Sequence, residues 1–372
     1  MIRRIGLAVW IAMIWVWASP ASAMESGPAP NLMHGLDRLA QQEQTALEQR
    51  GVVLREASLT QYLQAVAGHL WKQVRTDLDP PEIIVIADTR IQAFAYPNGF
   101  CYLTTGMLSR LANEDQLAMI ISHELVHYAH QDSAELYRYV QTTSFDKAMQ
   151  SSHWFPATQK VIRREIDAAE HRADAEGLSI LKKSGYCEQE AISLMLDLAK
   201  ILQNQAPPEF SSYLETRTRF IEAQLDQAHD QFACTPTTDS GPESYLHKIA
   251  PALIVNAQAA LQSGNWDQAD TSISRFLTMK PDSARANYLK GEILRRRNDD
   301  TGREQCMGYY EKALKNDPDF ALAYRALGEL YFKAGRYDAA KPYFETFLSL
   351  APQDDARKYI EGYLDRCSIT KP

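Results

Sequence analysis

Five residues in the N-terminal half have the types and spacing of a metal-binding pair with a base beside it. His123-Glu124-Leu125-Val126-His127 has the pattern HExxH, and its apolar flanks favour a helix. Four residues advance a helix by about 400° and about 6 Å, so the two imidazoles project from one face and can hold one zinc ion. Glu124 lies one position round the helix, where it can act as a general base toward water without being a ligand. Burial of these three side chains without a metal is costly, so the motif predicts a zinc site.

A third ligand must come from another part of the chain. The glycine and third histidine of the metzincin pattern are absent, because the motif is followed by residues 128–132 (YAHQD). Residues 170–174 (EHRAD) offer Glu170 as a ligand from a later helix, with Asp174 four residues on and able to orient a ligand histidine. His171 is a rival ligand that the glutamate-to-aspartate spacing disfavours. The pattern predicts one zinc ion per chain with a position left for water, which is the chemistry of peptide hydrolysis.

The elements that must hold these residues are mainly helices. Asn113, followed by Glu114 and Asp115, predicts the capped start of the helix that carries HExxH. A second helix is expected from about residue 161 to 183, before Gly185, and the segment 137–160 is expected as a loop or broken helix that could form a lid.

A small sheet is expected before the HExxH helix. Apolar residues at three- and four-residue steps predict one helix over residues 32–74, which Pro80-Pro81 ends. Residues 82–87 then read as a buried strand, and residues 92–96 and 100–104 as two strands around the turn Pro97-Asn98-Gly99. The predicted fold class is α+β, mainly α, with an exposed edge on the sheet.

The C-terminal third has an internal repeat. Alignment on Pro281, Pro318 and Pro352 gives steps of 37 and 34 residues, close to the 34-residue tetratricopeptide period. The consensus positions of three units are occupied by Gly264, Trp266 and Ala269; by Gly291, Tyr310 and Ala313; and by Tyr324, Leu327, Gly328, Tyr331, Ala340 and Phe344. The pattern predicts an α-helical tetratricopeptide-repeat solenoid over residues 249–366.

The chain resembles the family-48 zinc metallopeptidases, the HtpX- and BepA-like gluzincins. The resemblance covers about residues 32–231 and lies in HELVH, in EHRAD as the family's ExxAD pattern, and in residues 93–99 leading to 105–108. A signal peptide, a peptidase domain and C-terminal repeats also match a BepA-like architecture. It implies a gluzincin-type peptidase domain, a zinc cofactor, and degradation of misfolded or misassembled outer-membrane proteins.

One part of the family pattern is changed. The family commonly has His-Pro before an arginine about six residues later; here Tyr213-Leu214 occupies that place and Arg219 keeps the arginine. A histidine that occludes the metal is therefore not expected. Tyr213 is a candidate for hydrogen bonding to a developing oxyanion, with core packing as the alternative. Arg219 is a candidate for substrate contact or ligand support, with a surface ion pair as the alternative.

The first 23 residues have the features of an export signal. Arg3 and Arg4 precede an apolar run, and Ala21-Ser22-Ala23 is a small-residue cleavage pattern, so cleavage after Ala23 is expected. An uncleaved membrane anchor is the alternative, but the apolar run is short for a span. The predicted domains are then 1–23 signal peptide, 24–233 peptidase, 234–248 linker and 249–366 repeats.

Composition limits the function classes further. The chain is 45% hydrophobic and 23% charged, which excludes disorder and a multi-span membrane protein. Its net charge of -8 disfavours nucleic acid as a partner. The five cysteines of an exported chain are expected to form some disulfide, with no readable pairing among Cys101, Cys187, Cys234, Cys306 and Cys367.

The expected function is that of a periplasmic zinc metalloendopeptidase acting on unfolded or misassembled envelope proteins, whose repeats bind clients or the outer-membrane assembly machinery. Peripheral membrane contact is compatible with this location. A chaperone or adaptor that uses the peptidase fold mainly for binding is the alternative, and a scaffold with an inactive metal site is a third reading.

Overall fold

The computed structural model describes residues 32–135, 155–202, 208–227, 241–297 and 300–369. Contacts divide the chain into an N-terminal unit ending at Ile249 and a C-terminal unit beginning at Ala250. Within the described ranges, no helix has both the length and the apolar character needed to cross a membrane. The predicted signal peptide and most of the predicted lid, residues 137–154, lie outside the described residues.

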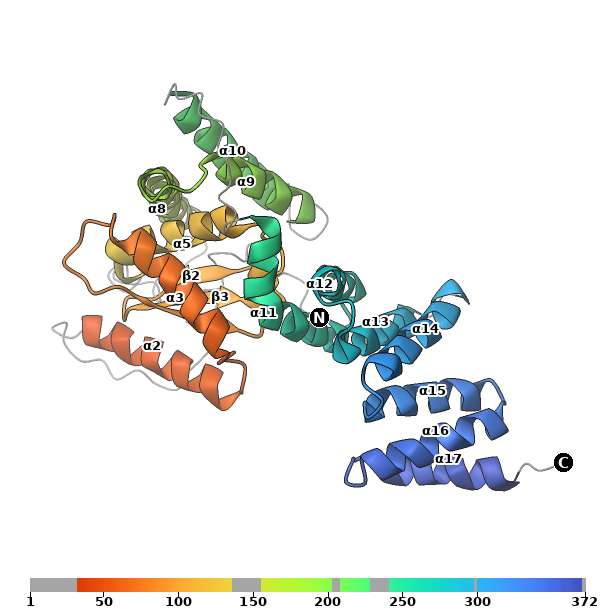
Figure 1. The fold of residues 1–372 in the computed structure, drawn as a ribbon. Coiled ribbons are helices and arrows are strands. Elements are labelled where there is room, and N and C mark those ends of the chain that lie inside the picture. Colours follow the sequence, from red (N-terminus) through yellow and green to blue (C-terminus); the bar gives the residue numbers. More distant parts are fainter. Residues whose placement is uncertain (1–31, 136–154, 203–207, 228–240, 298–299, 370–372) are drawn as a thin grey trace. The chain divides into compact units, whose positions relative to one another are not determined.

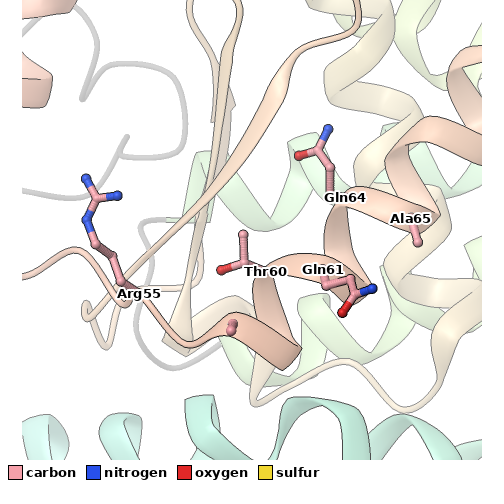
Figure 2. Close-up of a pocket in the computed structure, with 6 residues that line it drawn as sticks. Arg55, Thr60, Gln61, Gln64 and Ala65 are labelled. Atoms are coloured by element: carbon pink, nitrogen blue, oxygen red, sulfur yellow. The ribbon is translucent and has the colours of Figure 1, made fainter.

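The described part of the N-terminal unit begins with two helices, α2 (Leu32–Gln49) and α3 (Ala57–Trp71). The expected single helix over residues 32–74 is therefore wrong. The chain turns at Gly51, whose φ of 65° is a left-handed conformation that glycine adopts readily, and Glu56 then caps α3 by accepting a hydrogen bond from Leu59 N. A shallow groove of about 730 Å³ lies along the start of α3 and is lined by Arg55, Ala57, Thr60, Gln61, Gln64 and Ala65 (Figure 2).

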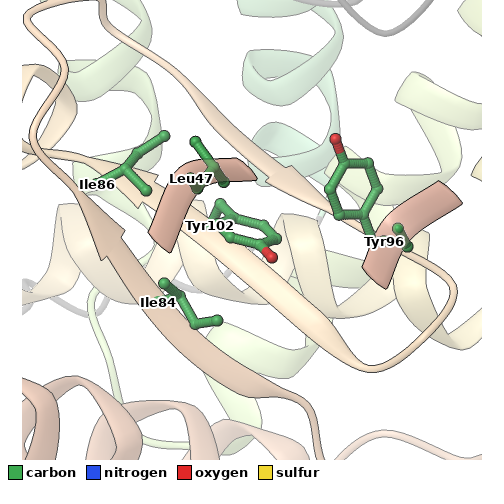
Figure 3. Close-up of a cluster of buried hydrophobic side chains, with 6 residues drawn as sticks. Leu47, Ile84, Ile86, Tyr96 and Tyr102 are labelled. Atoms are coloured by element: carbon green, nitrogen blue, oxygen red, sulfur yellow. The ribbon is translucent and has the colours of Figure 1, made fainter. Parts of the chain in front are cut away.

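Three short strands form the sheet in the order β1-β3-β2. β1 (Glu82–Ile86) runs parallel to β3 (Phe100–Thr104), and β2 (Ala93–Ala95) runs antiparallel to β3. Alternate residues point to opposite faces. One face packs on α2 in a cluster of Ala40, Leu47, Ile84, Ile86, Tyr96 and Tyr102 (Figure 3). The predicted strands are confirmed, and the side chains of Ala93 and Ala95 on edge strand β2 are buried.

A close backbone approach follows β3. The short helix α4 (Thr105–Leu108) is capped by Thr104, whose hydroxyl accepts a hydrogen bond from Met107 N. A Cβ at Gly106 would lie 2.2 Å from the Arg90 carbonyl oxygen, so only glycine fits there. The close approach of the Arg90 carbonyl oxygen therefore explains the glycine in the Thr-Gly-Met-Leu segment.

Among the described residues up to 227, the longer helices that follow are α5 (Glu114–Ala129), α8 (Phe155–Lys183), α9 (Gln189–Leu202) and α10 (Pro208–Gln227). α8 packs on α5, and α10 packs on α8 and α9 (Figure 1). α8 begins at Phe155, earlier than the predicted start near residue 161, so the end of the predicted lid is helical.

The C-terminal unit is helical. Its helices are α11 (Pro242–Ser263), whose first residues belong to the N-terminal unit, and then α12 (Trp266–Met279), α13 (Ala284–Arg297), α14 (Asp300–Asn316), α15 (Ala321–Lys333), α16 (Tyr337–Leu350) and α17 (Arg357–Ile369). The helices α13/α14 and α15/α16 pack as pairs. In each of these pairs, a glycine of the first helix lies against an aromatic ring of the second, Gly291 against Tyr310 and Gly328 against Phe344. The repeat pattern read from the sequence therefore forms stacked helical hairpins.

The predicted linker over residues 234–248 differs from the structure at its end. Residues 242–248 form the start of α11 and are not an irregular connection. Tyr245 explains the difference, because it is fully buried and its hydroxyl donates to the Leu108 carbonyl oxygen at 2.9 Å. The part of the predicted linker before Gly241 lies outside the described residues.

Candidate metal centre

The helix α5 is buried along nearly its whole length. Asn113 caps it by accepting a hydrogen bond from Gln116 N at 2.9 Å. The negative charges of Glu114 and Asp115 in its first turn interact favourably with the positive end of the helix dipole. Every residue from Glu114 to Tyr128 is buried. Gly177 of α8 lies against His123, where an added Cβ would be 3.4 Å from the His123 backbone nitrogen. α8 therefore packs directly on α5 at the HExxH motif.

His123, His127 and Glu170 meet between α5 and α8. One ligand atom from each lies within 4.8 Å of the others, and all three residues are buried. The two histidine Nε2 atoms are 3.0 Å apart. His123 Nε2 lies 3.5 Å from one Glu170 carboxylate oxygen, and His127 Nε2 lies 3.4 Å from the other. The predicted ligand set is thus brought together by the fold.

These separations fit a tetrahedral metal ion. Nitrogen and oxygen atoms bound to one zinc ion at about 2.0–2.1 Å lie about 3.3–3.4 Å from one another. Both carboxylate oxygens of Glu170 are buried, each faces one of the two Nε2 atoms, and Oε2 also pairs with Arg217. A buried carboxylate whose oxygens face two imidazole nitrogens is the donor set expected of a metal site.

Each histidine is oriented by its other ring nitrogen. His123 Nδ1 lies 3.0 Å from an Asp174 carboxylate oxygen, as the sequence predicted. His127 Nδ1 lies 2.8 Å from Asp132 Oδ2, and Asp132 in turn pairs with Arg172. A carboxylate on Nδ1 fixes the ring and leaves Nε2 to face the metal position. Asp132 and Arg172 are support residues that the sequence reasoning did not assign.

Arg217 of α10 contacts both buried carboxylates of the cluster, Glu170 and Asp174. Its guanidinium forms two hydrogen bonds with Asp174, Nε at 2.8 Å and Nη2 at 2.5 Å, and its Nη1 lies 3.0 Å from Glu170 Oε2. Arg217 is buried, with 8% of its surface exposed. This bidentate geometry neutralises one of two buried carboxylates and touches the other.

The buried charges shift the pKa values of the cluster. Burial raises the pKa of Glu170, but Arg217 and the hydrogen bonds from His123 and His127 outweigh burial and hold it well below its ordinary value. Burial likewise raises the pKa of Asp174, and Arg217 outweighs it and lowers the pKa to about 2. Both carboxylates are therefore anionic at neutral pH, as a metal ligand and its support require.

Glu124 has a different environment. Burial raises its pKa, against the opposing effect of His127 and His123. Its Oε2 atom is buried and has no hydrogen-bond partner. A carboxylate with a raised pKa and an unengaged oxygen beside a metal-ligand set has the properties of a general base.

The other sequence candidates lie elsewhere. The structure does not bring Arg219 to the cluster: it is exposed on α10, 3.5 Å from Glu215 one turn away. His171 stacks on Phe220, with ring centroids 4.7 Å apart, and does not belong to the ligand set. Tyr213 lies in α10, and its side chain is outside the described part of that helix.

A sequence signal for Arg217 existed. Leu214, Thr218 and Ile221 are the buried face of α10, at three- and four-residue steps, and Arg217 shares that face with them. An arginine on the apolar side of a helix implies a buried anionic partner, whereas Arg219 falls on the polar side.

Two further features lie outside the cluster. The groove along α3 contains none of the cluster residues, and its Gln64 is engaged with the Pro81 carbonyl oxygen at 3.0 Å. Among the cysteines, Cys187 is disulfide-bonded, and Cys101, Cys306 and Cys367 are buried thiols outside any disulfide. Cys234 lies outside the described residues.

A mainly helical domain in which HExxH meets a glutamate of a later helix, followed by helical hairpins, defines a metallopeptidase-type domain with a repeat domain. Residues 57–229 match the model of peptidase family M48, and residues 254–302 and 308–355 match a tetratricopeptide-repeat model. The chain therefore has the architecture of an M48 peptidase with C-terminal tetratricopeptide repeats. The family resemblance and the α+β, mainly α fold class are confirmed.

Solved structures give weaker likenesses. The crystal structure of MamA protein shares 15% identity over 48% of this chain and 87% of that chain, with a TM-score of 0.27. The TPR2AB domain of yeast Sti1, in its pHSP90 complex, shares 11% identity over 71% of this chain and 98% of that chain, with a TM-score of 0.30. No curated protein matches the chain significantly.

Proposed function

We propose that this chain is a zinc-dependent metalloendopeptidase of the periplasm that degrades misfolded or misassembled envelope proteins, including outer-membrane proteins. The cluster of His123, His127 and Glu170, with ligand-atom separations of 3.0–3.5 Å beside the unengaged oxygen of Glu124, carries the proposal. M48 family membership and the repeats support the coarser function, a metallopeptidase that binds proteins through its repeats.

The chemistry divides between the metal and the chain's own residues. A zinc ion held by His123, His127 and Glu170 would supply Lewis-acid activation of water and of the scissile carbonyl. Glu124 takes the proton from the attacking water and passes it to the leaving amine, a role that its raised pKa favours. Asp132 and Asp174 keep the imidazoles oriented.

The edge of the sheet offers a place for an extended substrate. β2 is an edge strand and packs on α5, which carries the HExxH motif. In its antiparallel pairing, Ala93 and Ala95 direct their backbone groups away from β3, and the Ala95 carbonyl oxygen accepts a hydrogen bond from Ser133 Oγ at 3.0 Å. Backbone pairing at such an edge tolerates many side-chain sequences, which suits a peptidase of unfolded chains.

Export and protein binding extend the proposal. The N-terminal signal pattern and the disulfide bond of Cys187 support an oxidising compartment. The repeats would dock clients or the outer-membrane assembly machinery, since stacked helical hairpins form extended binding surfaces. Cell fractionation with N-terminal sequencing checks this part: a periplasmic protein that begins at Met24 is expected, and a cytoplasmic protein with an intact N-terminus would contradict it.

The test of the chemistry is Glu124→Gln. The variant is expected to retain one zinc ion per chain, because Glu124 is not a ligand, and to lose at least 10²-fold of wild-type cleavage of casein or an unfolded envelope protein. Glu215→Gln, on the exposed side of α10, is the control and should cleave as the wild type does.

Other outcomes separate the alternatives. Full activity in Glu124→Gln would contradict the mechanism. Stoichiometric zinc in the wild type without cleavage of any client would favour the chaperone or adaptor. Absence of stoichiometric zinc would favour a scaffold with an inactive metal site.

A further inference from the structure

The first turn of α5 is held by a cluster that the HExxH chemistry does not use. Glu114, the first residue of α5, has a side chain that is only 12% exposed. Its Oε2 lies 2.8 Å from Lys248 Nζ, and its Oε1 accepts a hydrogen bond from the Tyr186 hydroxyl at 3.2 Å. We call Glu114, Tyr186 and Lys248 the α5 anchor.

Lys248 belongs to α11 and is fixed from two sides. Besides the ion pair with Glu114, its Nζ lies 4.8 Å from the centre of the Tyr62 ring of α3, a cation–π distance. Three residues earlier, Tyr245 is fully buried and donates to the Leu108 carbonyl oxygen at the end of α4. The start of α11 thus contacts the elements that lead into α5 as well as its first residue.

Tyr245 and Lys248 lie beyond the region that the peptidase family model covers, whereas the residues that they contact lie within it. The family match ends at residue 229, and the N-terminal unit ends at Ile249. α11 itself continues to Ser263, within the first repeat. α11, which continues into the first repeat, therefore supplies Tyr245 and Lys248, which hold the start of α5.

A restraint on the start of α5 acts on its chemistry because α5 is a continuous, buried helix. Glu114 and His123 are nine positions apart, which is about 14 Å along a helix axis. A packed helix moves as one body, so a shift or fraying of its first turn changes the position of His123 and Glu124 relative to Glu170 on α8. A misplacement of about 1 Å in a catalytic geometry can cost about 10²-fold in rate.

We propose that Lys248 and Tyr245 are positioning residues of the peptidase, which hold α5 through Glu114 and the end of α4 and make the start of α11, within the N-terminal unit, part of the support of the candidate metal centre. The activity readout of this proposal rests on the proposed function. Amide exchange in α5 does not depend on the proposed function, so failure of the positioning proposal can be distinguished from failure of the proposed function.

The experiment compares full-length variants. Lys248→Met removes the charge and keeps the length of the stem, Tyr245→Phe removes one hydroxyl, and Lys248→Arg is the conservative replacement. Glu243→Gln, at an exposed position in the first turn of α11, is the matched control. Backbone amide exchange of α5 peptides, zinc dissociation measured with a competing chelator, and kcat and KM on an unfolded protein substrate are measured for each.

Lys248→Met and Tyr245→Phe are expected to increase amide exchange in α5 but not in α13–α16, and to weaken zinc retention by about threefold to tenfold. Their kcat is expected to fall by a similar factor with KM nearly unchanged, since the reacting groups and not the substrate edge are displaced. Lys248→Arg should restore both values, and Glu243→Gln should match the wild type.

The proposal is overturned if Lys248→Met and Tyr245→Phe show wild-type exchange in α5 and wild-type zinc retention. It is also overturned if exchange rises throughout the N-terminal unit, because the residues would then serve general stability. If Lys248→Met does not fold, Tyr186→Phe decides the matter: it removes only the second hydrogen bond to Glu114, and unchanged α5 exchange in that variant contradicts the anchor. A wild type without peptidase activity would contradict the proposed function and leave the exchange and zinc results as the test of positioning.

Discussion

At the scale of single residues, the site depends on how its buried charges are paired. Glu170 and Asp174 are fully buried carboxylates that share Arg217, and each histidine has a carboxylate on Nδ1. A buried charge is tolerated when partners in hydrogen-bonding geometry compensate its lost hydration. The carboxylates on Nδ1 also orient the two rings, so the charge network that permits burial directs both Nε2 atoms toward Glu170.

Replacement of Arg217 tests this dependence. Arg217→Met leaves Asp174 without its guanidinium partner and Glu170 with one fewer, so the free energy of unfolding of the N-terminal unit is expected to fall by roughly 3–5 kcal/mol. Arg219→Met, two residues on in α10, is the matched control, because Arg219 is exposed and its loss should change stability by less than about 0.5 kcal/mol. Chemical denaturation of both variants measures the difference, and equal effects would contradict the pairing.

At the scale of the elements, the stability of the repeat domain depends on close packing between the two helices of each hairpin. A Cβ at Gly328 of α15 would lie 2.6 Å from the ring of Phe344, which is fully buried in α16. Gly291 and Tyr310 repeat the contact one hairpin earlier. The glycines of the repeat consensus therefore mark where two helices of a hairpin approach each other across an aromatic ring.

Gly328→Ala is expected to destabilise the repeat domain by about 1–3 kcal/mol, because Phe344 must leave its position to admit the methyl group. Gly362→Ala in α17 is the matched control: nothing lies within 4 Å of an added Cβ there, so higher helix propensity should stabilise by about 0.5–1 kcal/mol. Thermal unfolding distinguishes the two, and a neutral or stabilising Gly328→Ala would contradict the packing argument.

A buried ion pair in α13 makes the repeat domain sensitive to acid. Glu292 accepts hydrogen bonds from Arg295 Nε at 3.0 Å and from the Tyr310 hydroxyl at 2.6 Å. Burial raises the pKa of Glu292, but Arg295 outweighs burial and lowers it. A lowered pKa in the folded state contributes stability above the ordinary glutamate value of about 4.3, and this stability is lost as pH falls through the lowered value.

Glu292→Gln is therefore expected to be less stable than the wild type at pH 7, by roughly 1–3 kcal/mol, with the difference closing as the pH falls below the ordinary glutamate value of about 4.3. Denaturant titrations across that range check the sign. Glu345→Gln in α16, whose side chain is 57% exposed, should show little difference at any pH. A Glu292→Gln difference that grows on acidification would contradict the lowered pKa.

At the scale of the molecule, the metal should link chemistry to stability. The candidate ligands come from α5 and α8, two helices that pack on each other, so an ion bound to His123, His127 and Glu170 would join them. A ligand that binds only the folded state stabilises it by mass action, by about 4 kcal/mol when its concentration is 1,000 times Kd.

Removal of the metal by a chelator is expected to abolish peptidase activity and to lower the Tm of the N-terminal unit by several degrees, with both restored by zinc. The C-terminal unit, which supplies no ligand, should unfold at an unchanged temperature. His123→Ala should show the lower Tm from the start and no response to the chelator. A wild-type Tm that does not respond would contradict a metal bound at this cluster.

Local patterns were sufficient for most elements of this fold. The helical period around HExxH, the Asn113 cap and the apolar strand runs each depend on residues near one another in the sequence, and each appears as predicted. The 34-residue period likewise encodes a hairpin that repeats. One error occurred where a distant contact decides: α11 begins early because Tyr245 is buried against Leu108. The break between α2 and α3 at Gly51 has local causes that the sequence reasoning missed.

The sequence by itself predicted the candidate ligand set, because HExxH places two histidines and a base on one helical face and the glutamate-to-aspartate spacing favours Glu170. Only the tertiary structure decided how that chemistry is supported. Whether Arg217 or Arg219 reaches Asp174, and which carboxylate lies on His127, depends on how α10, α8 and the residues after α5 pack together. Support of this kind is made by charges far apart in the chain, which no local period brings together.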